Sequence, residues 1–284
     1  MIKQINIVKA NGETAPYDRN RLIGSLVNAG TSKENIDFVL DGIEKIIYDG
    51  ISTKELYRKA FSLLRNRSDI SAGRYRLKKA ILDMGPTGFP FEQLVGELFR
   101  TFGYEAEVGV EFQANCVSHE LDVVARNKKQ MIMVECKFHS EAGRKSDVKV
   151  PLYIHSRFLD VKSKWQEMYD DKYDYQGWVV TNTRFSKDAI KYGKCSGLHL
   201  MSWDYPVKGS LKYWIDQAGL HPVTSLHNLR KSESRALLEK NIVLCRQIPG
   251  AESYLRSLGI PESRIRKTLD EAEALSEGIH RQNQ

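Results

Sequence analysis

The chain has 284 residues, 41% of them hydrophobic, so it is long enough for more than one domain and has ample material for a buried core. Its formal net charge of +7 suits a polyanionic partner, although generic basic proteins carry such a charge as well. The cysteines are scattered without a C-x-x-C pair, which argues against a zinc site and a disulfide framework. The polar start and the lack of a long apolar run argue against a signal peptide and a membrane span, so we expect a cytoplasmic protein.

Residues 1–84 are predicted to form a separate, mainly helical unit that begins with a β-hairpin. An apolar run at the start leads into Asn11-Gly12, the strongest short hairpin signal. Ser52 and Glu55 form a capping-box pattern that opens one of the helices. The apolar spacing and the helix-ending glycines predict four helices, over residues 19–29, 33–48, 54–67 and 71–82. A Gly/Pro-rich linker at 84–88 closes the unit.

The middle of the chain, residues 89–205, is predicted to form an α/β sheet with helices on both faces. A helical apolar stripe stops at Gly103, where we expect the helix to end. The predicted elements, in chain order, are a helix over 89–102, strands over 119–125 and 131–138, a long helix, a strand over 176–183, a helix over 186–194 and a strand over 198–203.

Three charged side chains are predicted to meet on the first two strands of this sheet. Because side chains alternate across a strand, Glu135 and Lys137 point to one face of the second strand. On the first strand, Asp122 shares a face with Glu120 and Val124. Two carboxylates and an ammonium beside an apolar sheet are unfavourable unless they hold a divalent cation and do chemistry. The alternative is a surface hairpin with an ordinary Glu–Lys pair.

A set of short motifs lies around these charged residues. They are Phe91-Glu92, Leu94, Leu98, Gly103-Tyr104, His119-Glu120-Leu121-Asp122, Glu135-Cys136-Lys137 and Trp203-Asp204-Tyr205. With them the central part resembles the restriction-endonuclease-like nucleases that carry the PD-(D/E)-x-K signature, and it is closest to their Mrr-like branch. Leu121 stands where the signature has a proline.

The resemblance implies roles for individual residues. Asp122 and Glu135 would be ligands of Mg²⁺ or Mn²⁺, and Lys137 would orient or activate the attacking water and steady the pentavalent phosphate. Glu92 would be the helix acid that some members add to the metal shell, although Glu97 lies on the same helix. His119 and His139 flank the site, and we expect them to be polar strand-end residues rather than ligands.

The chemistry of phosphodiester hydrolysis asks for the same groups. The reaction needs a lowered water pKa, a cation over the non-bridging oxygens and help for the leaving oxygen. Hard carboxylate oxygens suit Mg²⁺ or Mn²⁺, and waters and substrate complete the coordination shell. We therefore predict a metal-dependent endonuclease that acts on DNA, with RNA left open because the metal chemistry is indifferent to the sugar. The alternative is a non-cleaving, nucleotide-sensing DNA-binding adaptor that retains the nuclease fold.

The first unit carries a second set of motifs. They are Val8-Lys9-Ala10-Asn11-Gly12, Pro16-Tyr17-Asp18-Arg19-Asn20-Arg21-Leu22, Ala29-Gly30, Asp49-Gly50-Ile51-Ser52-Thr53 and Ala72-Gly73-Arg74-Tyr75-Arg76-Leu77. They resemble the ATP-cone, the nucleotide-sensing module of ribonucleotide reductases and their repressors. The resemblance implies that Lys9, Arg21 and Thr53 bind ATP or another adenine nucleotide as an effector. Ala10 stands where the family has an arginine, so the alternative is a degenerate cone kept as an oligomerisation or DNA-binding scaffold. Hydrolysis of ATP is not expected, because the chain has no P-loop.

Residues 206–284 are predicted to form a helical tail, with one helix packing through Leu237 and Leu238. Further on, the turn at 258–261 resembles a helix-hairpin-helix element, which would aim backbone N–H groups at a DNA phosphate. A plain helical hairpin used for packing is the alternative. The sequence as a whole predicts a multidomain α/β protein with DNA and an adenine nucleotide as partners and a homo-oligomeric assembly.

Overall fold

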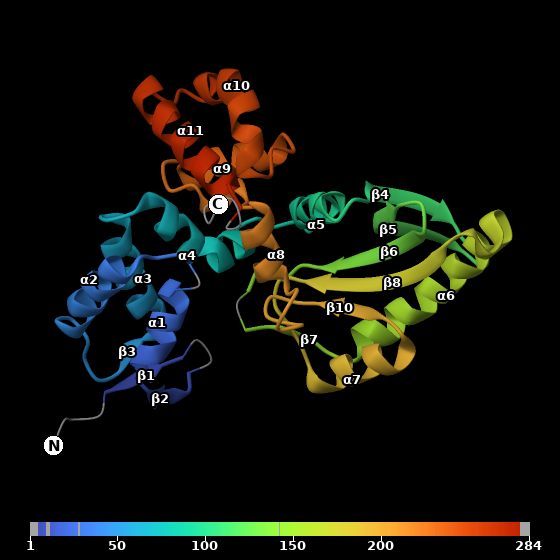
Figure 1. Ribbon diagram of the computed structural model, residues 1–284, viewed down its shortest axis with the longest axis horizontal. Helices are drawn as coiled ribbons and strands as arrows, with labels where there is room; N and C mark the ends of the chain where they lie inside the picture. Colours follow the sequence, from blue (N-terminus) through green and yellow to red (C-terminus); the bar gives the residue numbers. More distant parts are fainter. Residues whose placement is uncertain (1–4, 10–11, 28, 142, 279–284) are drawn as a thin grey trace.

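The computed structural model describes residues 5–9, 12–27, 29–141 and 143–278. This part of the chain is a mixed α/β protein with a helical first unit, a central five-stranded sheet and a group of C-terminal helices (Figure 1). The C-terminal helices lie above the place where the first unit meets the central sheet (Figure 1). None of the described helices is long and apolar enough to cross a membrane.

The first unit contains the predicted hairpin. Strand β1 (Asn6–Val8) pairs antiparallel with β2 (Thr14–Pro16), and Gly12 in the turn between them has a left-handed φ of 82°. A third strand, β3 (Ile51–Ser52), adds to β1 in parallel. The hairpin prediction is confirmed, although Ala10 and Asn11 themselves lie outside the described residues.

Four helices complete the first unit, as predicted. They are α1 (Arg19–Val27), α2 (Lys33–Glu44), α3 (Thr53–Arg65) and α4 (Asp69–Leu82). The Ser52 hydroxyl accepts a hydrogen bond of 3.1 Å from the Glu55 N–H, so Ser52 caps α3 as its sequence pattern predicts. The apolar faces of the helices pack into a core of their own, in which Leu26, Val39 and Leu64 are fully buried.

Helix α4 belongs to two cores at once. Ala72, near its start, is buried in the core of the first unit. Leu77 and Ile81, five and nine residues further on, are buried in a second core that they share with the central sheet and the C-terminal helices. The helix therefore connects the first unit rigidly to the rest of the molecule.

The central sheet is mixed, with strand order β10-β8-β6-β5-β4. Its strands are β4 (Glu105–Gln113), β5 (Ser118–Arg126), β6 (Gln130–Lys137), β8 (Asp174–Thr181) and β10 (His199–Met201). The first three pair antiparallel, which confirms the predicted β5–β6 hairpin, and β8 and β10 continue the sheet in parallel. A two-stranded sheet, β7 (Lys145–Ser146) with β9 (Arg184–Phe185), lies beside it.

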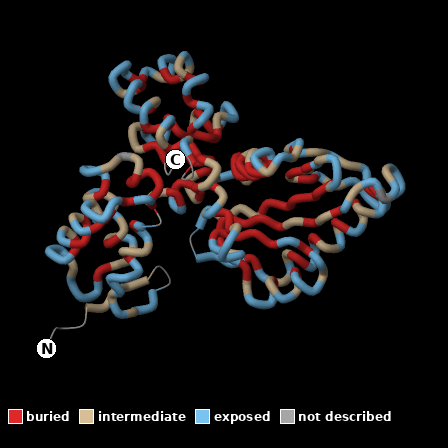
Figure 2. Tube along the Cα trace, viewed as in Figure 1, coloured by how far each residue is buried: buried red, intermediate tan, exposed pale blue. Residues whose placement is uncertain are grey.

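Helices cover both faces of this sheet, as predicted. Helix α5 (Phe89–Thr101) packs on one face, where Phe91 and Leu94 share a core with Val134. Helices α6 (Lys149–Tyr169) and α7 (Lys187–Ser196) cover the other face, where Phe158 and Ala189 share a core with other residues of the sheet. Figure 2 shows the buried residues concentrated along the middle strands and at the foot of the C-terminal helices.

Two predictions for the sheet were incomplete. Strand β4 was not predicted at all, although it pairs with β5 at both ends and on either side of Gly109. The predicted strand over 198–203 is shorter, because the Ser202 N–H donates to the Tyr205 carbonyl in a tight turn instead of continuing the ladder. The same turn brings the Trp203 N–H to the Thr183 carbonyl, at 3.0 Å.

The C-terminal region is helical. Its elements are α8 (Leu211–Ala218), α9 (Lys231–Glu239), α10 (Glu252–Ser257) and α11 (Glu262–Ser276), with short 3₁₀ turns at Val223–Ser225 and Cys245–Ala251. Leu237 and Leu238 are buried, which confirms the predicted packing of α9. Gly259, with φ of 72°, turns the chain between α10 and α11, so the predicted helical hairpin is present.

Candidate active site

Strand β5 changes face at Asp122. Leu121 packs in the core under α6, whereas Val123 packs in the core under α5. On a regular strand, residues two positions apart point to the same face, so the backbone turns over between these two residues. The partner strand β4 changes face at the same level, at Gly109, whose φ is 69°. The prediction that Asp122 shares a face with both Glu120 and Val124 is therefore wrong, because the alternation is interrupted there.

Asp122 joins the two strands of the hairpin. Its Oδ2 accepts a hydrogen bond of 2.6 Å from the Cys136 backbone N–H. Burial and the nearby Glu135 charge raise the pKa of Asp122 from 3.8 to about 7, against the opposing effects of that N–H and of Lys137. A carboxyl group in this state takes up a proton near neutral pH unless a cation compensates its charge.

Glu135 lies at the centre of the charged cluster and is only 4% exposed. Its Oε1 is 2.5 Å from the Lys137 ammonium, so these two side chains lie on one face of β6 as predicted. Its Oε2 is 2.6 Å from Nη1 of Arg157 on α6. Each oxygen of this buried carboxylate therefore has a cation as its partner.

Arg157 was not found by sequence reasoning. Its guanidinium also donates to the Glu120 carbonyl and lies 5.7 Å from the centre of the Tyr153 ring. Its Nε is buried with no hydrogen-bond partner among the described residues. The signal in the sequence is a cation on an apolar helical stripe, since Arg157 stands three residues after Ile154 and four before Val161, both fully buried.

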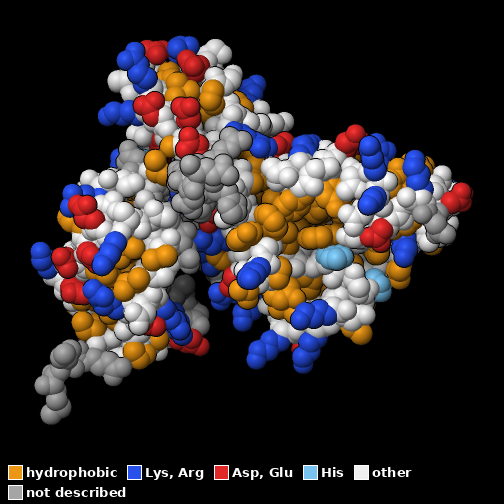
Figure 3. Space-filling view, in the orientation of Figure 1, with side chains coloured by type: hydrophobic (Ala, Val, Ile, Leu, Met, Phe, Trp, Pro, Cys, Tyr) orange, Lys and Arg blue, Asp and Glu red, His pale blue; other side chains and the backbone are white. Residues whose placement is uncertain are grey.

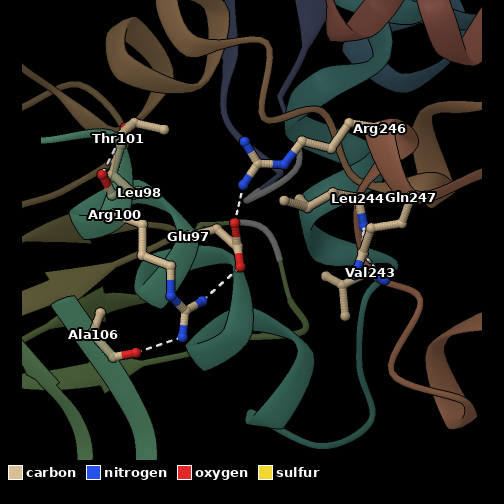
Figure 4. A network of polar contacts seen from close by, with 9 residues as sticks. All are labelled: Glu97, Leu98, Arg100, Thr101, Ala106, Val243, Leu244, Arg246 and Gln247. Atoms are coloured by element: carbon tan, nitrogen blue, oxygen red, sulfur yellow. Dashed lines mark hydrogen bonds and ion pairs between the residues drawn. The ribbon is translucent and has the colours of Figure 1, made fainter. Parts of the chain in front are cut away.

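Of the two acids on α5, Glu92 lies nearer to the cluster. Burial and the charges of Glu120 and Glu135 raise its pKa, and Lys137 lowers it, so Glu92 senses the same charges as Asp122. Glu97 is held elsewhere: it forms an ion pair with Arg100 at 2.5 Å and another with Arg246 of the C-terminal region (Figure 4). The choice between the two acids that the sequence left open thus falls on Glu92.

The two flanking histidines have other partners. His119 Nε2 lies 2.8 Å from Asp160 Oδ2 on α6, and both side chains are largely buried. His139 Nε2 lies 3.2 Å from the Ser146 hydroxyl, and burial lowers its pKa. These contacts agree with polar structural roles.

The carboxylate oxygens of the site are the kind of ligand that a hard divalent cation prefers, but they are few. In the part of the chain that the structure describes, no three His, Cys, Asp or Glu side chains form a ready-made metal cage. Mg²⁺ needs no such cage, because it is often bound by one or two carboxylates together with waters and substrate phosphate. Asp122 and Glu135 supply such oxygens, and the raised pKa of Asp122 is the property that a cation would reverse.

The three predicted nucleotide-binding residues also come together. Lys9, Arg21 and Thr53 line one cavity of about 240 Å³ in the first unit. Tyr57 and Tyr75 form part of its wall and stack on each other with ring centres 5.0 Å apart. Thr53 is the first residue of α3, where backbone N–H groups favour an anion.

Known proteins place the central domain in a class. Residues 85–205 match the family described as restriction endonuclease, and residues 221–276 match the family described as AF1548-like, C-terminal. The sheet with its acidic cluster is thus a restriction-endonuclease-like domain. The chain belongs to the family of an uncharacterized protein of Archaeoglobus fulgidus, which is 34% identical over 180 residues that make up 63% of this chain and 97% of the relative.

Two solved structures are similar. The crystal structure of the protein of unknown function AF1548 has a TM-score of 0.54 and 32% identity, covering 67% of this chain and 98% of its own. Can2 from Sulfobacillus thermosulfidooxidans, solved in complex with cyclic tetra-adenylate, has a TM-score of 0.34 and 15% identity over 72% of this chain and 63% of its own. The second likeness is too slight to bear on this chain.

Proposed function

We propose that this protein is a nuclease that hydrolyses DNA phosphodiester bonds with Mg²⁺ or Mn²⁺ at Asp122, Glu135 and Lys137, assisted by Glu92. The observation that carries the proposal is the buried Glu135, paired with Lys137 inside a restriction-endonuclease-like domain. A buried carboxylate beside a second one whose pKa is raised is unfavourable for stability, and cation binding gives such a pair a use.

Each residue has a defined task in this proposal. Asp122 and Glu135 would hold the cation, which would supply positive charge to the phosphate and lower the pKa of the attacking water. Lys137 would orient that water and stabilise the charge that develops on the phosphate oxygens. Arg157 would hold the Glu135 carboxylate in place, because it pairs with one of its two oxygens while Lys137 pairs with the other.

The test is cleavage of linear, branched and single-stranded DNA, and of RNA, with Mg²⁺ or Mn²⁺. Lys137→Ala removes the water-positioning ammonium, and the rate should fall at least about a hundredfold. Binding should persist, because most affinity for nucleic acid comes from phosphate contacts elsewhere. Lys128→Ala is the matched control and should cleave at the wild-type rate. Lys128 is exposed and lies just before the start of β6, whereas Lys137 is at its end. Wild-type activity in Lys137→Ala would contradict the assignment.

The alternative is an adaptor that binds DNA without cleaving it. The same assay separates the two functions, because the adaptor would bind every substrate that it recognises and cleave none with either metal. Cleavage of RNA but not of DNA would keep the chemistry and change the substrate.

We further propose that the first unit binds an adenine nucleotide, as an ATP-cone does, through Lys9, Arg21 and Thr53. The supporting observation is their shared cavity, which Tyr17 also lines; the Tyr17 hydroxyl is buried and has no hydrogen-bond partner among the described residues. At about 240 Å³ the cavity is slightly smaller than most ligand sites, so the base and sugar would be enclosed and the phosphates would lie at its basic rim.

Calorimetry with ATP, ADP and dATP on the full chain tests this second proposal. Arg21→Ala should weaken binding at least about tenfold, because it removes a charge-assisted hydrogen bond to phosphate. Arg58→Ala removes another exposed arginine, on α3 and outside the cavity, and should leave the affinity unchanged. Absence of binding heat at millimolar nucleotide would leave the first unit as a scaffold. Binding that changes neither cleavage nor assembly would exclude regulation while leaving the binding site in place.

A further inference from the structure

A cavity of about 580 Å³ lies where the three parts of the molecule meet. Helix α4 forms one wall, the linker at Gly85 and Pro86 with Ser140 of the central domain forms a second, and α9 with the preceding loop forms the third. In the space-filling view, Lys and Arg side chains gather along the border between the first unit and the central domain (Figure 3).

The charged residues of this cavity are mostly cations. Arg76 and Lys79 come from α4 and Lys231 and Arg235 from α9, and they face a single lining acid, Asp83. Asp83 pairs with Lys79 at 2.8 Å and with Arg76 at 3.7 Å, so it neutralises only part of the charge of that wall. On the α9 wall, both cations are exposed, and Arg235 pairs with the surface acid Glu239 at 3.3 Å.

The walls are held in fixed positions. Leu77 and Ile81 of α4 share one continuous core with Leu229 and Leu237 of the C-terminal region. The buried Thr224 hydroxyl, which also lines the cavity, donates a hydrogen bond of 2.7 Å to the Ala80 carbonyl of α4. The helices that carry the cations are therefore in place before a ligand binds, which reduces the entropy lost on binding.

The cavity adjoins the candidate active site. Ser140 follows Lys137 by three residues, at the end of the strand that carries the proposed catalytic pair. Gly85 packs so closely on Phe138 that a Cβ added to the glycine would lie 2.9 Å from the ring. A Cβ added to Gly88, further along the same linker, would lie 3.1 Å from a Glu92 carboxylate oxygen. The linker thus lines the cavity at one end and contacts the acidic cluster at the other.

We propose that this cavity, called the groove from here on, binds the phosphate backbone of the nucleic acid and leads it to the active site. This inference rests on the proposed nuclease function. The groove is open to solvent and has cations on the two helices that form its walls. It is also continuous with the acidic cluster of Glu92, Asp122 and Glu135, and these features suit a polymer of phosphates. The groove is sequence-independent in its recognition, because its charged groups are suited to phosphate and sit on rigid walls.

The helix-hairpin-helix turn fits this role less well. The N–H groups of Gly259 and Ile260 already donate to the carbonyls of Arg256 and Leu255. The first residue of α11, Glu262, is an acid that pairs with Arg256 and would repel a phosphate.

The experiment measures binding of labelled duplex and single-stranded DNA by fluorescence anisotropy across a range of salt concentrations. The Lys137→Ala protein serves as background, so that the DNA stays intact. Adding Lys231→Ala and Arg235→Ala should weaken binding at least about tenfold and reduce the slope of log K against log salt by about 1.8 for duplex, that is about 0.9 for each lost contact. The control is Lys128→Ala with Lys129→Ala, which removes the same charge at the exposed β5–β6 turn. Thermal melting confirms that both double variants are folded.

The outcomes separate the groove from the nuclease function. An equal loss of DNA affinity in both double variants would show that only net charge matters, which would contradict the groove proposal. An unchanged affinity, or no DNA binding at all, would contradict it as well. If the groove pair alone weakens binding while the wild-type protein cleaves nothing, the groove proposal stands and the nuclease proposal fails. If the wild-type protein cleaves DNA and the groove pair leaves DNA binding unchanged, the nuclease proposal stands and the groove proposal fails.

Discussion

Asp122 destabilises the metal-free protein at the position where it is proposed to bind metal. Its pKa of about 7 in the folded chain lies well above its ordinary value of 3.8, chiefly because of burial and the charge of Glu135. Between these two pH values the folded state binds more protons than the unfolded state. The free energy of unfolding therefore falls as the pH rises through this window, and it stays low above it.

The prediction at this scale is that Asp122→Asn stabilises the protein in the presence of a chelator at pH 8, by about 1–3 kcal/mol, because the amide keeps the shape without the charge. The gain should shrink toward pH 4 and should be offset by excess Mg²⁺, which only the aspartate holds well. Thermal melts at several pH values measure it. Asp174→Asn is the control of opposite sign, because the Gln176 and Gln130 amides lower the pKa of Asp174 and no gain is expected. An equal gain at pH 4 and pH 8 would rule out the electrostatic cause.

At the scale of elements, sequence patterns predicted those structures whose signals are local. The β5–β6 hairpin follows from two apolar runs around a polar turn, and α3 follows from the Ser52 cap. The overlooked β4 also has a local signal, since Ala106, Val108, Val110 and Phe112 alternate with exposed residues.

The rest of the site depends on contacts that no local pattern contains. The burial of residues along β5 alternates regularly through Asp122, so the change of face there is visible only in the two different cores that Leu121 and Val123 join. Arg157 reaches Glu135 from a helix 22 residues away in sequence, and the choice of Glu92 over Glu97 depends on Arg246, which is 149 residues from Glu97. Such long-range partners are determined by tertiary packing, so the sequence predicted the acids and the lysine but not the arginine or the groove.

At the scale of the whole molecule, the core that joins α4, the central sheet and the C-terminal helices makes these parts depend on one another. Ile81→Ala removes a fully buried side chain from that core and should lower the free energy of unfolding by about 2–5 kcal/mol. Hydrogen exchange should rise together in α4, α5 and α9. Leu40→Ala creates a similar cavity in the core of the first unit, and its effect should remain within that unit. Faster exchange confined to α4 in Ile81→Ala would show that the parts unfold independently.

Because α4 contributes to both cores, it also contributes to both cavities described above. Tyr75 lines the cavity of the first unit and Arg76 lines the groove between the parts, so neighbouring residues of one helix serve both. Consecutive side chains on a helix diverge by about 100° and share a planar peptide, so a rotation or shift of α4 that moves one also moves the other. A signal between the two cavities would therefore need no hinge and no relay of side chains. Movement of the one helical turn that carries Tyr75 and Arg76 would be enough.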